Sequence, residues 1–180
     1  IAAGANSTLG IEGDLDVDAD GMGGFNDFDV DGGDGTGGSV SLFTADGNAS
    51  ISVTGTADLE ADGEGSVDGS DCTACGGAGG DGIGGTVSVF NHSGTNNIIA
   101  FSTALDLSAE GYGGIGVTGA AGLGEGGDAT VNARAGLTVR VGGDLTIELD
   151  RNPDIIAGVS ANGLFKIGFA AETDDLLGNA

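Results

Sequence analysis

An alternating segment that returns four times along the chain limits what this sequence can fold into. The copies read IEGDLDVDADGMG from Ile11, VTGTADLEADGEG from Val53, FSTALDLSAEGYG from Phe101 and VGGDLTIELDRNP from Val141, at spacings of 42, 48 and 40 residues. A second motif lies out of phase with the first and reads GGSVSLF from Gly37, GGTVSVF from Gly84 and GGDATVN from Gly126. Because one such unit cannot bury its own apolar face, this self-similarity predicts units that stack on one another.

Within each copy, apolar and polar residues alternate with a period of two, which predicts β-strands with one face buried and one face in water. The inward residues are small or medium in size, and a glycine or threonine in the second slot marks a corner of the chain. The predicted inward sets are Ile11, Leu15, Val17, Ala19; Val53, Ala57, Leu59, Ala61; Phe101, Leu105, Leu107, Ala109; and Val141, Leu145, Ile147, Leu149.

These patterns predict an all-β fold, a parallel β-solenoid (β-helix) of about four repeats of 40–48 residues. An antiparallel sandwich is the alternative. The 40 glycines concentrate in stretches such as Gly76 to Gly85, which we interpret either as loops or as extra coils. We expect residues 1–160 to form the repetitive unit and residues 161–180 to form a degenerate last coil or the start of a cap. The whole is expected to be a segment of a longer chain.

The charge of the chain excludes several functions. Asp and Glu number 28 and Lys and Arg only 4, so the net charge is −24, and all four cations lie after residue 133. A surface this negative repels nucleic-acid phosphates and anionic lipid, so neither is an expected partner. No run of 18 apolar residues occurs, and we expect no insertion into a membrane.

The segments GDGTGGSVSLFTADG, SISVTGTADLEADGEG and GDGIGGTVSVF resemble the glycine-rich repeats of large secreted bacterial adhesins, of the filamentous haemagglutinin and autotransporter passenger type. That resemblance implies a location outside the cell or at the cell surface. It also implies a non-catalytic structural or adhesive role, as a stalk or filament of stacked coils. The expected partners are the chain itself, by end-to-end or lateral stacking, or neighbouring repeats of a longer chain, and surface glycans.

Rows of carboxylates are the strongest candidate for a site. Aligning the copies gives three rows of carboxylates: Asp16, Asp58 and Asp106; Asp18, Glu60 and Glu148; and Asp20, Asp62, Glu110 and Asp150. Hard oxygen ligands suit calcium, and Asp16, Asp18, Asp20 and Asp27 follow the spacing of a twelve-residue calcium loop. The alternative is that these aspartates are only the solvated face of a strand. A calcium-dependent acidic binding module that folds on export is therefore the second functional hypothesis.

Catalytic motifs are absent from the sequence. A carbohydrate-active β-helix enzyme is a weaker third hypothesis, because paired carboxylates hydrolyse glycosides but here they recur in every copy. Cys72 and Cys75 form the sequence CTAC and are a candidate disulfide, with free thiols as the alternative. His92 is the one histidine, so a zinc site with four ligands from this chain is not expected.

Overall fold

The computed structural model describes residues 1–24, 31–66, 77–114, 120–133, 136–148, 157–161 and 165–167. In this part of the chain all regular structure is β-strand, and no helix is long and apolar enough to cross a membrane. The strands form five short sheets that lie side by side, and every strand pair between neighbours is parallel. Period-two alternation with small, β-branched inward residues accounts for this choice of structure.

Three of the sheets are the wider ones. Sheet A contains β1 (Ala2–Ala3), β6 (Ser39–Thr44), β11 (Thr86–Asn91), β16 (Asp128–Ala133) and β19 (Ala157–Ala161). Sheet B contains β2 (Thr8–Ile11), β7 (Ser50–Val53), β12 (Asn97–Phe101), β17 (Leu137–Val141) and β20 (Phe165–Ile167). Sheet C contains β3 (Leu15–Asp18), β8 (Ala57–Glu60), β13 (Leu105–Ser108) and β18 (Leu145–Glu148).

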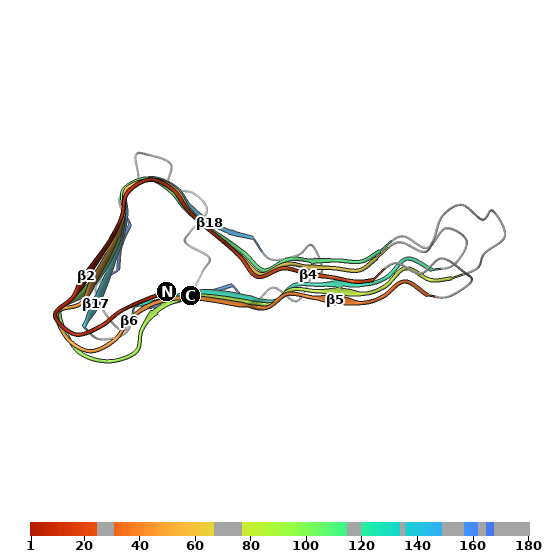
Figure 1. The fold of residues 1–180 in the computed structure, drawn as a ribbon, viewed down its shortest axis with the longest axis horizontal. Coiled ribbons are helices and arrows are strands. Elements are labelled where there is room, and N and C mark those ends of the chain that lie inside the picture. Colours follow the sequence, from red (N-terminus) through yellow and green to blue (C-terminus); the bar gives the residue numbers. More distant parts are fainter. Residues whose placement is uncertain are drawn as a thin grey trace.

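The other two sheets are made of two-residue strands and form a narrow arm. Sheet D contains β4 (Gly21–Met22), β9 (Gly63–Glu64) and β14 (Gly111–Tyr112). Sheet E contains β5 (Gly35–Thr36), β10 (Gly82–Ile83) and β15 (Gly124–Glu125). Figure 1 shows sheets A, B and C around a triangular cross-section and the arm extending from it.

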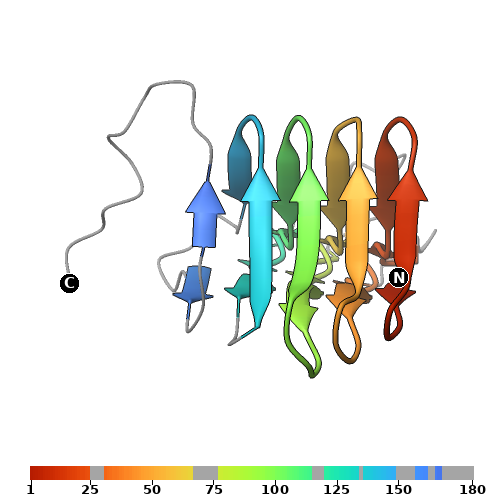
Figure 2. The same cartoon turned by 90° about the vertical axis from the view of Figure 1, so that its left-hand side faces the viewer.

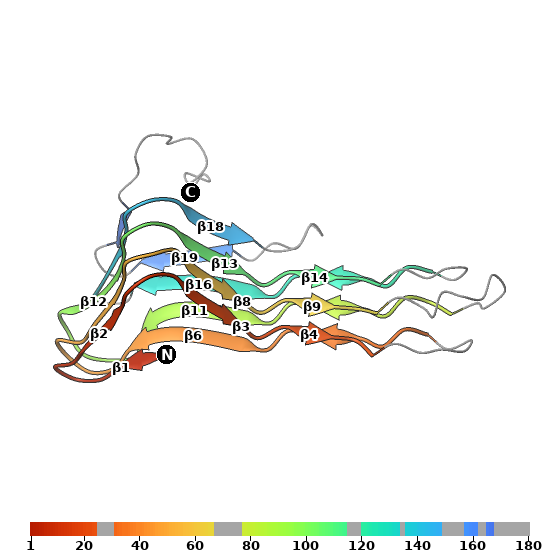
Figure 3. The same cartoon turned by 45° about the horizontal axis from the view of Figure 1, so that its top comes forward.

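The chain visits the sheets in the same order on every circuit, A, B, C, D and E, and each circuit is called a turn below. The first turn is β1 to β5, the second β6 to β10 and the third β11 to β15. β16 to β18 belong to the fourth turn, and β19 and β20 open the fifth. Figure 2 shows successive turns side by side, and Figure 3 shows them continuing into the arm.

The hydrophobic core lies between sheets A, B and C. Its residues are the inward members of the alternation, and in the second and third turns they are fully or almost fully buried. The predicted inward sets of those two turns are confirmed, from Val53 to Ala61 and from Phe101 to Ala109. Sheet A adds a third wall that the alternating copies do not include, with Val40, Leu42, Val87, Val89, Ala129 and Val131.

The corner between sheets A and B depends on residues with a left-handed backbone. Asn6, Asn48 and Asn96 have φ angles of 53°, 57° and 59°, and Gly136 has the same role in the fourth turn with a φ of 92°. Asparagine and glycine adopt this conformation at the lowest cost. The side chains also form a ladder, because Asn48 Nδ2 donates to Asn6 Oδ1 at 3.2 Å and Asn96 Nδ2 to Asn48 Oδ1 at 3.4 Å.

The arm has no side-chain core. Its two sheets face each other through glycines that occupy every second position, so the two backbones are in direct contact. A Cβ built on Gly63 would lie 2.5 Å from the carbonyl carbon of Ile83 in the facing sheet, and closer still to its oxygen. The same crowding recurs at Gly21, Gly23, Gly33, Gly35, Gly65, Gly80, Gly82, Gly111, Gly113 and Gly122.

These observations correct the predicted fold class. The sequence predicted a β-solenoid of about four repeats, a single narrow column with glycine-rich stretches as loops or extra coils. That prediction is wrong. The chain builds five separate short parallel sheets side by side, and only three of them enclose apolar side chains. The described glycine-rich residues are strands of the arm, because alternate glycines let two sheets meet at backbone distance.

Candidate functional site

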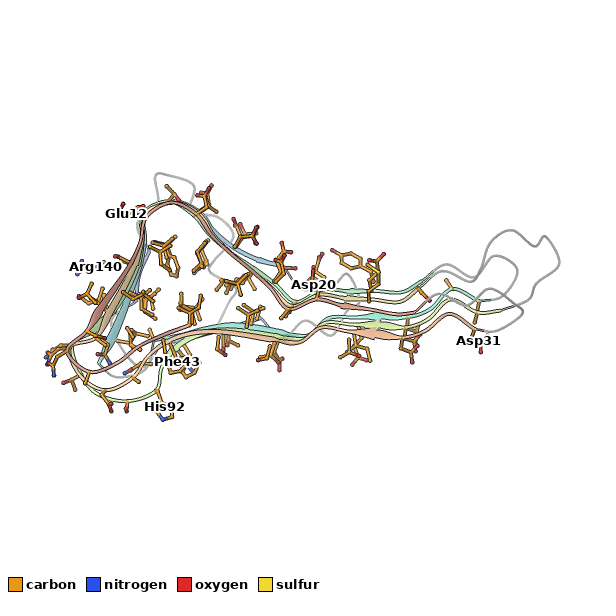
Figure 4. The ribbon with its side chains drawn as sticks, in the orientation of Figure 1. Glu12, Asp20, Asp31, Phe43, His92 and Arg140 are labelled. Carbon is orange, nitrogen blue, oxygen red and sulfur yellow. The ribbon has the colours of Figure 1, made fainter. Side chains whose placement is uncertain are left out.

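The outer face of sheet C carries the carboxylates that the repeats align. The strand register places Asp16 beside Asp58 and Asp58 beside Asp106. In the next row Asp18 lies beside Glu60, as the repeat alignment predicts. Asp20, which follows β3 on the same side, is labelled in Figure 4 and points away from the core. The inward neighbours on the same strands, such as Leu59 and Leu107, hold this face in place by burial.

Glu60 does not meet another carboxylate in the third turn. Its register partner there is Ser108, and the following partner is Glu148, so a serine separates the two glutamates of that row. Ser108 is buried, and its Oγ donates to Asp62 Oδ1 at 2.7 Å. Because serine is uncharged, this row has one negative charge fewer, and the Ser108 hydroxyl holds the carboxylate of Asp62 in the neighbouring row.

The third acidic row is held by backbone amides. Asp20 Oδ1 accepts the N–H of Asp62 at 2.8 Å, and Asp62 Oδ1 accepts the N–H of Glu110 at 2.7 Å. The same aspartate-to-amide bonds recur next to sheet E. Asp34 Oδ1 accepts the N–H of Asp81 at 2.8 Å, and Asp81 Oδ1 accepts the N–H of Leu123 at 2.7 Å. Each carboxylate therefore links its own turn to the next by a charge-assisted hydrogen bond.

Crowding of like charges perturbs two carboxyl groups on this face. The Asp16 carboxylate is the main cause that raises the pKa of Asp18. Burial, and then the carboxylates of Asp58 and Asp62, raise the pKa of Glu60 from its usual 4.5 to about 7. Neighbouring parallel strands are about 4.8 Å apart, a distance at which two like charges repel appreciably even near water. Glu60 can therefore exchange a proton close to neutral pH.

A shallow hollow of about 230 Å³ lies at this place, open to solvent. It is lined by Asp58, Glu60, Asp106, Leu107, Ser108 and Thr146. A hollow with several carboxylates and one raised pKa can bind protons and attract small cations. It offers a flat row of oxygens and not a closed cage.

The predicted calcium loop is not formed by the residues that can be placed. Asp16 and Asp18 lie in the extended strand β3, where alternate side chains follow each other along one face. Asp20 follows the strand with its Oδ1 already bound to an amide of the next turn. Asp27 lies outside the described residues. Over the described ranges, no three His, Cys, Asp or Glu side chains are grouped so that they could hold a metal ion.

Cys72 and Cys75, the candidate disulfide, lie outside the described residues. The sequence analysis missed the aspartate-to-amide links of the arm. Their signal is an aspartate directly before a glycine at the same register, as in Asp20-Gly21, Asp34-Gly35, Asp62-Gly63 and Asp81-Gly82.

The first turn is a second candidate site, because its outer edge has no preceding turn among the described residues. Its inward residues Leu9, Ile11, Leu15, Val17 and Ala19 are only partly buried and pack against the core from one side. Their counterparts one turn later are fully buried or nearly so, namely Ile51, Val53, Ala57, Leu59 and Ala61. Within the described residues, the apolar side chains of the first turn are therefore less buried than those of the second.

A family model for the C-terminal domain of DNA/pantothenate metabolism flavoproteins matches residues 130–180. No curated protein and no solved structure matches the chain. The match covers less than a third of the chain and describes a similarity of that segment. The residues of this segment that the structure describes lie mainly in strands of sheets A, B and C, in register with the earlier turns.

The matched family is by its description a flavoprotein family, so the segment was tested for a fit to a flavin. A flavin needs an apolar slot for its ring system and donors or cations for its phosphate. The inward residues Val131, Val139 and Val141 are at most 2 % exposed and fill the core. Arg140 faces solvent on the opposite side of its strand. The described residues of the segment therefore do not fit a flavin.

The comparison corrects the resemblance drawn from the sequence. The family found is a metabolic flavoprotein domain and not an adhesin repeat family. The predictions that rested on the resemblance are withdrawn with it: the structural or adhesive role, the absence of enzymatic activity, and the description as a secreted adhesin filament or β-helix repeat. Neither the described residues nor the comparison supports calcium, and binding of calcium by Asp16, Asp18, Asp20 and Asp27 stays a prediction. The expected location and partners stay predictions.

Proposed function

We propose that this chain is an association module, whose first turn pairs with a further turn of the same cross-section supplied by a second copy of the chain. The observation that carries the proposal is the half-buried apolar residues of the first turn, whose counterparts in the second turn are fully buried. A further turn over this edge would bury Leu9, Ile11, Leu15 and Val17 in the same way. Burial of apolar surface is the main favourable term in such an association.

The backbone of the first turn supports the same proposal. In the second turn the N–H of Ser50 donates to Ser7 O at 2.9 Å, and the N–H of Thr54 donates to Ile11 O at 3.1 Å. The equivalent residues of the first turn are Thr8 and Glu12, whose amides point toward the open edge by the same geometry. Exposed edges of this kind add strands readily. Parallel addition in the internal register uses the pairing that already joins the turns.

The oligomeric state of the chain in solution tests the proposal. We expect sedimentation velocity to show association that grows with concentration. The variant Thr8→Pro removes the edge-facing amide at the first residue of an edge strand, a place where proline is tolerated. We expect this variant to stay monomeric while its circular dichroism and its melting temperature at low concentration stay close to those of the unaltered chain.

Thr8→Val is the matched control, because it removes the same hydroxyl group but keeps the amide. It should associate like the unaltered chain. A chain that is monomeric at every accessible concentration would refute the proposal, and so would equal association of the Thr8→Pro and Thr8→Val variants.

The family match suggests flavin binding by residues 130–180 as a second function to be tested. A fluorescence titration of the chain with flavin mononucleotide measures it directly. Because the described residues of that segment form a filled core, we expect no saturable quenching. Saturable quenching would show that the residues outside the described ranges complete a flavin site.

A further inference from the structure

The outer face of sheet A carries almost no charge, unlike the acidic outer face of sheet C. The outward positions of β6, β11 and β16 hold hydroxyl, amide and aromatic side chains and one carboxylate: Ser39, Ser41, Phe43, Thr86, Ser88, Phe90, Asp128, Thr130 and Asn132. Asp128 has the one charge among these described positions. In a chain with a net charge of −24, this face suits a partner that carries no charge of its own.

Two aromatic rings form a stacked pair on this face. Phe43 and Phe90 are register neighbours, and their ring centroids lie 5.1 Å apart with 15° between the ring planes. Figure 4 shows Phe43 on the outer side of sheet A. Asn132 follows Phe90 in the same row. Because one face of the Phe90 ring lies against Phe43, its other face is turned toward the side of Asn132.

A row of hydroxyl groups lies beside the rings. The strand register places Ser41, Ser88 and Thr130 next to one another, two residues before the row of Phe43 and Phe90. Ser41 Oγ and Ser88 Oγ are 3.0 Å apart and share a hydrogen bond. Two residues along a strand span about 7 Å, so a ligand that packs on Phe90 has these hydroxyl groups close by. Hydroxyl and amide groups both donate and accept hydrogen bonds, as the hydroxyl groups of a sugar do.

We propose that the outer face of sheet A binds a neutral polysaccharide, with one sugar ring packed on the Phe90 ring and its hydroxyl groups bonded to Asn132 and Thr130. The C–H groups of a pyranose ring form an apolar side that packs on an aromatic ring, whose faces are electron-rich. The Asn132 amide can bond two neighbouring hydroxyl groups at once, because it has both donors and an acceptor. The net charge of the chain disfavours anionic polysaccharides.

The shape of this face favours a chain of sugars over a single sugar. The face of a sheet contacts a ligand from one side, whereas a site for a single small molecule encloses most of that molecule. A polymer gains by contacting several positions together, and the turns repeat the hydroxyl positions at a spacing of about 4.8 Å. The inference is independent of the proposed association, because it uses positions of the second, third and fourth turns only.

Affinity electrophoresis of the whole chain tests the inference, in native gels that contain hydroxyethyl cellulose, which is neutral, or alginate, which is anionic. We expect hydroxyethyl cellulose to retard the chain relative to a gel without polysaccharide, and alginate to have no effect. Phe90→Leu keeps an apolar side chain but removes the ring, and should raise the dissociation constant roughly three- to tenfold. Asn132→Asp removes the amide donors and should also weaken the retardation. Tyr112→Leu is the matched control, because it removes an aromatic ring that is 47 % exposed on the arm.

Three results would overturn the inference: no retardation of the unaltered chain by hydroxyethyl cellulose, equal retardation by alginate, or equal retardation of the Phe90→Leu, Asn132→Asp and Tyr112→Leu variants. If the ring pair only stabilised the pairing of two turns, Phe90→Leu would lower the urea midpoint and leave the retardation unchanged. Circular dichroism checks the fold of each variant. Should Phe90→Leu not fold, Asn132→Asp tests the same site, since it exchanges one polar side chain for another at a partly exposed position.

Discussion

A single methyl group placed between the two sheets of the arm should separate them. In Gly63→Ala the new Cβ would lie 2.5 Å from the carbonyl carbon and 2.7 Å from the nitrogen of Ile83. Ordinary contact for such atoms begins at about 3.4 Å. The two backbones must therefore move apart by about an ångström, and neither offers a flexible side chain that could yield. Overpacking of this kind costs about 1–3 kcal/mol.

Hydrogen exchange can show where in the molecule the Gly63→Ala variant is destabilised, as well as by how much. Gly65 N donates to Tyr112 O at 2.8 Å, two residues further along the same arm. If the arm opens more readily by about 1–3 kcal/mol, hydrogen exchange of this amide should be faster by roughly 5- to 150-fold. Amides of the core strands β7 and β12 should change much less, since the arm is a separate layer from the core.

Gly24→Ala is the matched control for this prediction. A Cβ at Gly24 meets nothing within 4 Å, although the residue lies on the same arm. We expect this variant to unfold like the unaltered chain or to be slightly more stable, because alanine restricts the unfolded chain. Equal arm exchange and equal urea midpoints in Gly63→Ala and Gly24→Ala would refute the account of the arm as backbone packed on backbone.

Two further predictions concern charge and burial. The pKa of Glu60 is raised to about 7 in the folded chain, so the folded state loses stability as pH rises from about 4.5 through 7. Glu60→Gln should therefore stabilise the chain at pH 8, by about 1 kcal/mol after allowance for solvent screening, and leave its stability unchanged at pH 4. Glu12→Gln is the control. Equal unfolding midpoints of the Glu60→Gln and Glu12→Gln variants at pH 8 would contradict the reasoning. Ile51→Ala should cost about 2–5 kcal/mol in urea unfolding, and Leu9→Ala clearly less in the dilute monomer, because Ile51 is fully buried and Leu9 only partly. Equal losses would show that the first turn is not an open end.

Sequence alone predicted the strands and their buried faces well, because alternation is a local signal. Leu59 and Leu107 were assigned to the inside and are buried, and the rows of Asp58 with Asp106 and of Asp18 with Glu60 are in register. Burial is the main cause of the raised pKa of Glu60, and the smaller contribution from neighbouring carboxylates was foreseeable, since rows of like charge at the strand spacing must repel.

The arm was not predicted, for a physical reason. Glycine carries no hydrophobic signal, so Gly33, Gly35 and Gly37 look like a loop when only apolar residues are counted. The informative feature is that these glycines occupy alternate positions, and that Gly33 and Gly35 lie against Gly23 and Gly21 of the other sheet. The family resemblance failed for a related reason, because it rested on glycine-rich composition and not on specific residues.

The register between turns makes the length of the molecule independent of its cross-section. Ser39 of the second turn lies directly beside Thr86 of the third, and the pairing continues without offset through Thr44 and Asn91. Removing the whole turn that begins at Ser39 would therefore join Gly38 to Thr86, which already lies at the register position of Ser39 in the next turn. Each turn contacts only its neighbours, so a chain of this design can gain or lose turns while its core, its acidic face and its arm keep the same shape.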